Sequence, residues 1–115
     1  MQGLQKEIVK TFFQTLEDIK YKKDFEIFFN DFLTSQELEV FSKRLAIAYW
    51  LKKGRDYENI KTNLKVTSKA ITEVKNIMNT SGIKLVLKKM EAEEWANVWS
   101  ERVNKFRLRD KKIVS

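Results

Sequence analysis

The residues of this chain best suited to chemistry are the lysines between positions 61 and 89. This window holds seven lysines and a single acidic residue, Glu73, and so contributes +6 to the +7 net charge of the 115-residue chain. The lysines are Lys61, Lys65, Lys69, Lys75, Lys84, Lys88 and Lys89. Concentrated ammonium groups attract a phosphate backbone and release its counterions on contact. The charge pattern therefore favours a nucleic-acid partner, with a solvated lysine-rich face as the alternative.

The composition excludes most catalytic chemistry, because the chain has no His and no Cys. It cannot build the usual zinc site, a thiol nucleophile or an imidazole acid–base pair. Carboxylates such as Glu91 and Glu94 share only a helical spacing, which is typical of a solvated face. We expect a protein that is not an enzyme and that uses no metal or cofactor.

The elements that position the lysines are expected to be helices, since zero Pro and only three Gly favour an all-α fold. Apolar residues at steps of three or four predict a first helix over about 4–21. After a short link at 21–24, a brief aromatic second helix runs to Leu33. Thr34 and Glu37 have the spacing of a capping box and predict a third helix, which stops at Gly54.

Two short helices joined by a turn are expected next. Asp56 can cap a helix of about 57–63, the chain turns at 64–66, and Thr67 or Ser68 caps a second helix that ends near Asn79. The apolar residues that would pin the pair together are Ile60, Val66, Ile71, Val74 and Ile77. This arrangement leaves the opposite face of the second helix projecting, with Lys69, Thr72, Glu73, Asn76 and Asn79.

A last long helix begins after Gly82 and ends in a basic tail at 107–115. One side of it carries Leu85, Ala92, Trp95, Trp99, Val103 and Phe106. Eight Phe, three Trp and three Tyr are a heavy apolar load for a chain of this length, so we expect a partner subunit to cover part of it.

The stretch Phe32 to Val86 resembles the Trp repressor superfamily, and is most like its branch of bacterial Trp-repressor-like proteins. Three segments carry the resemblance in order: FLTSQELEVFSKRLAIAYWLKKG, DYENIKTNLKVTSKAITEVKNIM and GIKLVL. The resemblance implies a six-helix fold with a central helix-turn-helix, an intertwined homodimer and a two-fold operator in double-stranded DNA. The single domain then divides into dimerisation helices (1–33), a helix-turn-helix core (34–82) and a carboxy-terminal helix with a basic tail (83–115).

The same resemblance implies roles for residues on the helix that enters the major groove. Lys69 could donate to guanine, Thr72 could touch a thymine methyl, Glu73 could accept from cytosine and Asn76 could pair with adenine. The expected phosphate contacts are Lys61, Lys65, Thr67, Ser68, Lys75 and Arg55. Lys65 stands where many relatives have Gly, and a positive φ there would cost about 1 kcal/mol.

The residues that resemble the corepressor site depart from the family pattern. The Trp repressor holds its ligand between two Arg and keeps a Gly beside the indole ring. Arg44 matches the first Arg, but Glu73 and Val74 stand at the second Arg and at the Gly. An anion would lose half its clamp, so we expect no tryptophan binding. Arg44 is a possible ligand residue, or else forms an ion pair with a glutamate such as Glu37.

The sequence thus predicts a repressor-like, sequence-specific transcriptional regulator with an unidentified effector, if it has one. The alternative is a protein-interaction module that docks a partner through Trp95 and Trp99 and has weak or lost DNA binding. The longest apolar run, 45–51, is too short to span a bilayer, and we expect a soluble cytoplasmic protein without membrane contact. Four glutamates oppose a membrane-surface role for residues 84–106.

Overall fold

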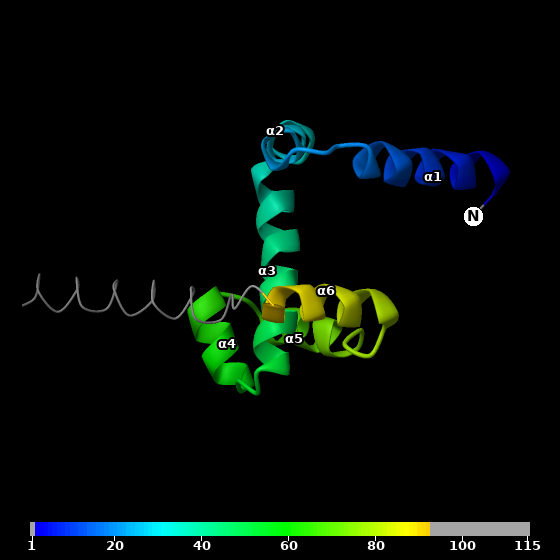
Figure 1. The fold of residues 1–115 in the computed structure, drawn as a ribbon. Coiled ribbons are helices and arrows are strands. Elements are labelled where there is room, and N and C mark those ends of the chain that lie inside the picture. The colour runs from blue at the N-terminus through cyan, green and yellow to red at the C-terminus, as the bar shows by residue number, and fades with distance from the viewer. Residues whose placement is uncertain (1, 93–115) are drawn as a thin grey trace, which may run out of the picture. The chain divides into compact units, whose positions relative to one another are not determined.

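The computed structural model describes residues 2–92, which form six α-helices and no strand. The helices are α1 (Gly3–Glu17), α2 (Lys22–Phe32), α3 (Ser35–Lys52), α4 (Tyr57–Leu64), α5 (Ser68–Lys75) and α6 (Ser81–Ala92) (Figure 1). The predicted all-α fold is confirmed. None of the helices in the described part of the chain has the length and apolar character that crossing a membrane requires.

Several helix boundaries differ from those predicted, and the largest differences are in α1, α2 and α5. Helix α1 ends at Glu17 rather than near residue 21, because the Ile19 N–H bonds back three residues to the Leu16 carbonyl (3.1 Å) and tightens the last turn. Helix α2 begins at Lys22, inside the predicted link. Helix α5 ends at Lys75 rather than near Asn79, where the backbone changes to bonds between residues three apart.

Local hydrogen bonds define both ends of α3. The Thr34 N–H donates to Glu37 Oε1 (2.9 Å) and the Glu37 N–H donates to Thr34 Oγ1 (3.1 Å), so the predicted capping box is formed. Hydrogen bonds from the Thr34 backbone, and then from its side chain, lower the pKa of the Glu37 carboxyl. At the other end Gly54 has φ +83° and its N–H donates to the Leu51 carbonyl (3.1 Å), so the helix stops at the predicted glycine.

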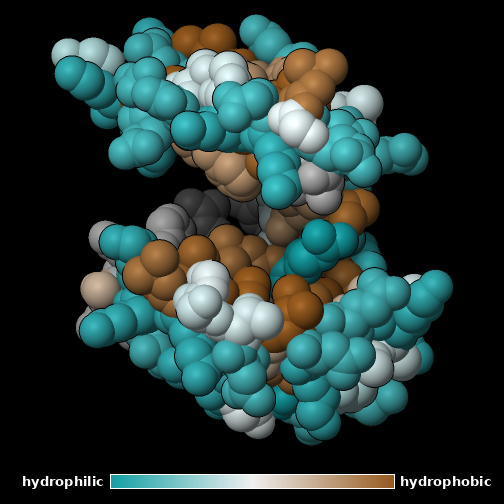
Figure 2. Space-filling view, turned by 90° about the vertical axis from the view of Figure 1, so that its right-hand side faces the viewer, coloured by the Kyte–Doolittle hydropathy of each residue, from teal (hydrophilic) through white to brown (hydrophobic). Residues whose placement is uncertain are grey.

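The chain divides into two compact units, with the boundary inside α3 between Phe41 and Ser42. In the amino-terminal unit neither α1 nor α2 has a buried residue. Its Phe side chains contact one another, with ring centroids 4.7 Å apart for Phe25 and Phe29 and 5.0 Å apart for Phe28 and Phe32. Many large apolar side chains of this unit are exposed: Leu4, Ile8, Phe12, Phe13, Phe25, Ile27, Phe32, Leu38, Val40 and Phe41. Figure 2 shows such apolar surface in brown among polar side chains.

The carboxyl-terminal unit has a buried core. Five consecutive residues of α3, Ala46 to Trp50, are buried, so this segment of the helix is covered on all sides. Around it pack Ile60 of α4, Ile71 and Val74 of α5, and Leu87 and Met90 of α6 (Figure 1, green to yellow). The core therefore fixes α4, α5 and α6 to the end of α3. The predicted stripe of Trp95, Trp99, Val103 and Phe106 lies outside the described residues.

Candidate nucleic-acid interface

Helices α4 and α5 form a helix-turn-helix whose ends are defined by side-chain caps. Asp56 Oδ1 accepts from the Asn59 N–H (2.8 Å) at the start of α4, and Thr67 Oγ1 accepts from the Ala70 N–H (3.1 Å) at the start of α5. Lys65, which follows the last residue of α4, has φ +54° and ψ +54°. Its left-handed conformation reverses the chain in the short turn at 65–67, one residue later than predicted.

Buried apolar side chains fix the angle between these two helices. Ile60 and Ile71 are fully buried and Val74 is 2 % exposed. Val66 and Ile77 are half-buried, and Val66 packs against the same core. Because α5 directs Ile71 and Val74 inward, its other faces are left open to solvent.

The open faces of α5 carry the hydrogen-bonding side chains singled out from the sequence. All of the expected base-contacting residues are exposed: Lys69, Thr72, Glu73 and Asn76. Five of the expected phosphate contacts are exposed as well: Lys61, Lys65, Thr67, Ser68 and Lys75. The helix-turn-helix therefore brings two sets of polar groups to the surface of one pair of helices.

The Thr72 side chain is partly engaged within its own helix. Its hydroxyl donates to the Ser68 carbonyl at 3.0 Å, so its hydrogen is already used. What it offers to a partner is a methyl group and an acceptor oxygen. This suits an apolar contact better than donation of a hydrogen bond.

Two cations at this interface are held by aromatic rings. The Arg55 guanidinium lies 4.1 Å from the ring centroid of Trp50, and its Nη1 donates to Asn59 Oδ1 at 3.0 Å. The Lys75 ammonium lies 5.7 Å from the ring centroid of Tyr57. Arg55 is consequently half-buried and links the end of α3 to α4, whereas Lys75 links α5 to α4.

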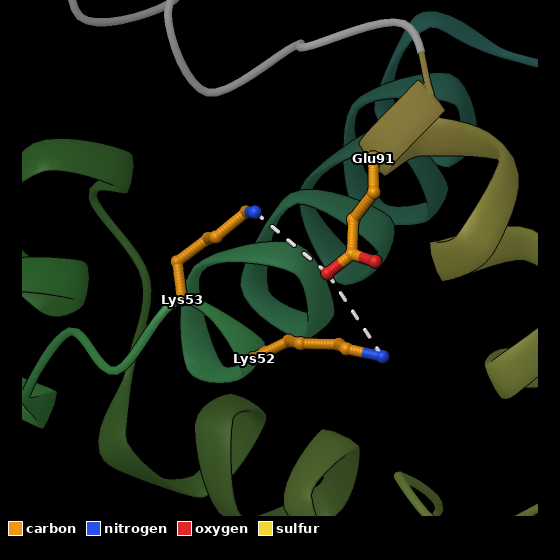
Figure 3. A network of polar contacts seen from close by, with 3 residues as sticks. All are labelled: Lys52, Lys53 and Glu91. Atoms are coloured by element: carbon orange, nitrogen blue, oxygen red, sulfur yellow. Dashed lines mark ion pairs between the residues drawn. The ribbon is translucent and has the colours of Figure 1, made fainter.

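The sequence interpretation missed the residues that contact these two cations, namely Trp50, Asn59 and Tyr57. Arg55 and Asn59 are four residues apart, but Arg55 precedes α4, so this spacing did not place the pair on one helical face. Nothing in the spacing connected Lys75 to Tyr57, because they lie on different helices. A second omission is the pair of ion pairs that Glu91 of α6 forms with Lys52 (3.9 Å), the last residue of α3, and with Lys53 (3.7 Å), which follows it (Figure 3).

Comparison with protein families agrees with this geometry. Residues 7–91 match the family model described as Trp repressor protein. The chain belongs to the Trp repressor family. This family consists of DNA-binding helix-turn-helix regulators and not of enzymes. Searches of curated proteins and of solved structures found no match.

The three residues that the sequence analysis compared with the family's corepressor site differ from one another in burial. Glu73 is exposed on α5, whereas Val74 is 2 % exposed and lies in the core. Arg44 is exposed on α3. The branched Val74 side chain thus fills space in the core. Residues 2–92 contain no cluster of acidic side chains able to hold a metal ion.

Proposed function

We propose that this member of the Trp repressor family is a sequence-specific, repressor-like transcriptional regulator of bacterial type that acts in the cytoplasm. The observation that carries the proposal is the orientation of α5. Its apolar residues Ile71 and Val74 are in the core while Lys69, Thr72 and Asn76 are exposed. A recognition helix needs this combination of a rigid anchor and free polar groups.

The proposed base contacts follow from the chemistry of the exposed side chains. Lys69 donates to guanine O6 or N7, and Asn76 pairs with adenine N6 and N7. Thr72 contacts a thymine methyl, for which its own methyl is suited. Glu73 accepts from cytosine N4, and this pairing offsets the repulsion between its carboxylate and nearby phosphates.

The proposed phosphate contacts surround this set. Lys61, Lys65, Thr67, Ser68 and Lys75 position the DNA backbone, and Arg55 adds a cation from the start of α4. Because Lys75 and Arg55 lie against aromatic rings, they lose less side-chain entropy when they bind than a lysine free in solvent.

The active form is proposed to be a homodimer. The exposed apolar residues of the amino-terminal unit support this, because contiguous apolar surface on a single chain marks an interaction site. Residues 1–33 then serve dimerisation, 34–82 form the helix-turn-helix core, and 83–115 form the carboxy-terminal helix and basic tail. A dimer presents two α5 helices to the two halves of an operator.

Tryptophan is not proposed as the effector, because Glu73 and Val74 replace the groups that bind it elsewhere in the family. Calorimetric titration of the protein with tryptophan should show no heat of binding. A Kd at or below about 100 µM, equivalent to roughly −5.5 kcal/mol, would contradict this and would return Arg44 to the role of a ligand residue.

Selection of sites from random duplex DNA tests the main proposal. We expect enrichment of a two-fold sequence whose half-sites are about one helical turn apart. Asn76→Ala should cost roughly 1–3 kcal/mol at particular bases, while Lys61→Ala should weaken all sequences alike and lower the log–log salt slope by about one per subunit. Asn30→Ala, at an exposed position of α2, is the matched control. Salt-independent binding, or no enriched sequence, would refute the proposal.

The alternative function is a protein-interaction module with weak or lost DNA binding. The exposed aromatic residues of the amino-terminal unit favour it, since Tyr and Phe are enriched at protein interfaces. Titration with mixed genomic DNA at two salt concentrations separates the two functions. Affinity that falls steeply with salt supports the regulator, whereas no binding at either concentration supports the interaction module.

A further inference from the structure

A second group of lysines lies where the end of α3 meets α6. Lys84, Lys88 and Glu91 are spaced by four and three residues, so they share one stripe of α6. Glu91 reaches Lys52 and Lys53 at the end of α3, and Figure 3 shows its carboxylate directed between the two ammonium groups. We call these five residues, Lys52, Lys53, Lys84, Lys88 and Glu91, the α3–α6 basic surface.

This surface carries an excess of positive charge that the rest of the described chain does not neutralise. It has four lysines and one glutamate, and the Glu91 carboxylate pairs with two of the lysines, Lys52 and Lys53. Lys84 and Lys88 are exposed, and no acidic group among residues 2–92 forms an ion pair with either of them. A net charge of +3 within one surface attracts polyanions.

The ion pairs of Glu91 are of the kind that a phosphate can replace. One oxygen, Oε1, is shared between Lys52 and Lys53 at 3.9 and 3.7 Å, and the lysine side chains are 41 % exposed. Exposed pairs of this length are weak and are screened by salt. A DNA phosphate carries one negative charge on two non-bridging oxygens, as the carboxylate does, and so can take its place at the same ammonium groups.

The chemistry of α6 favours nucleic acid over a lipid surface as the occupant. A helix that binds in a membrane inserts its apolar face. Here Leu87 and Met90 are 1 % and 8 % exposed, because they belong to the core. Leu85 is the one large apolar side chain of α6 that is exposed, so the surface offers mainly charge, which matches a DNA backbone better than a lipid surface. It also belongs to the same compact unit as the helix-turn-helix.

We propose that the α3–α6 basic surface binds the phosphate backbone of duplex DNA flanking the bases that α5 reads, and that Glu91 weakens this contact by occupying Lys52 and Lys53. The inference rests on the proposed function, since it assigns a second contact to the same DNA. The proposed phosphate contact adds affinity for DNA of any sequence, and the Glu91 carboxylate limits how much it adds.

The first test removes the two exposed lysines of α6 in the full-length chain. The Lys84→Ala/Lys88→Ala double variant is titrated by fluorescence anisotropy with a random-sequence duplex over a range of salt. The log–log salt slope should fall by about two per subunit, because each phosphate that a lysine neutralises contributes roughly 0.9 to it. Lys6→Ala/Lys10→Ala is the matched control, because it removes the same charge at the same spacing from exposed positions of α1 and should leave the slope near that of the wild type.

The second test removes the competing carboxylate. Glu91→Gln should tighten binding to the same duplex at low salt by roughly two- to fivefold, the equivalent of one exposed ion pair, and the gain should vanish at high salt. Glu7→Gln, on α1, is the control for the change in net charge. Circular dichroism melting confirms that each variant is folded.

The outcomes separate this inference from the proposed function. A wild-type chain that binds no duplex even at low salt overturns the proposed function, and the inference with it. A wild-type chain that binds, with both α3–α6 variants indistinguishable from their controls, overturns the inference alone. The inference also fails if the double variant loses binding to phosphatidylglycerol vesicles while its DNA salt slope is unchanged.

Discussion

The two units of this chain are both helical and both rich in apolar residues, but they differ in how far those residues are buried. In the carboxyl-terminal unit, nine residues from four helices form one buried cluster. In the amino-terminal unit, α1 and α2 bury none of their residues, and Phe13 is 64 % exposed. The carboxyl-terminal unit thus buries a cluster of apolar side chains within the single chain, and the amino-terminal unit leaves many of its large apolar side chains exposed to water.

This difference supports the proposal that the two units have different tasks. A unit with its own core is rigid enough to present α5 and the basic residues around it. A unit with exposed aromatic surface is stabilised only when another surface covers it. These are the features expected of a DNA-binding unit joined to a unit that associates with another protein surface.

The largest effect should come from the core that holds the recognition helix. Ile71→Ala removes a fully buried side chain and should lower the free energy of unfolding by about 2–5 kcal/mol, because apolar burial decreases and a cavity remains. Leu85→Ala, at a 59 % exposed position of α6, should change it by less than about 0.5 kcal/mol. Urea denaturation measures both. Equal decreases would mean that the core does not anchor α5.

A smaller effect is expected from the exposed face of α1. Phe13→Ala should weaken self-association by about 1.5–3 kcal/mol per buried side chain, because the proposed dimer buries a ring that is 64 % exposed in the single chain. Sedimentation equilibrium of the variant and of the control Lys10→Ala measures the dissociation constant. A wild-type chain that remains monomeric at every concentration would contradict the proposed homodimer.

Lys65 allows strain and charge to be separated within the helix-turn-helix. Lys65→Gly should raise the free energy of unfolding by about 1 kcal/mol, since glycine adopts the left-handed conformation without strain. Lys65→Ala keeps the strain. Both variants should lower the salt slope of DNA binding by about one per subunit, because both remove the same ammonium group. If only one of them changes the slope, Lys65 does not act as a phosphate contact.

The smallest effect concerns the capping box of α3. Folding lowers the Glu37 pKa below its ordinary value of 4.5, so the unfolded chain binds the proton more tightly. The stabilisation is therefore fully present above about that value and is lost as pH falls through the lower, folded pKa. The difference in Tm between wild type and Glu37→Gln should shrink over this acid range. An unchanged difference would show that the carboxylate does not stabilise α3.

Local signals predicted several features correctly. Thr34 and Asp56 were identified as caps, and Thr67 was one of two candidates with Ser68, because a capping side chain bonds to a backbone N–H two or three residues away. Gly54 ends α3 for a similar reason, since one residue must adopt a positive φ. The charge pattern and the polar face of α5 also followed from the order of the residues alone.

Features that depend on distant parts of the chain were missed. The Lys75–Tyr57 contact and the Glu91 ion pairs each join two helices, so no spacing in the sequence indicated them. The extent of α5 was overestimated because periodicity continued to Asn79, while the backbone had already changed to tighter turns. The roles proposed for individual residues towards DNA remain predictions.

The amino-acid sequence by itself determined that the chain is helical, where its helices are capped, and that one segment concentrates positive charge, because each of these depends on neighbours within a few residues. Only the tertiary structure decided which apolar residues are buried. The hydrophobic effect has no direction and no preferred partner along the chain, so Phe13 and Ile71 differ only in what packs against them.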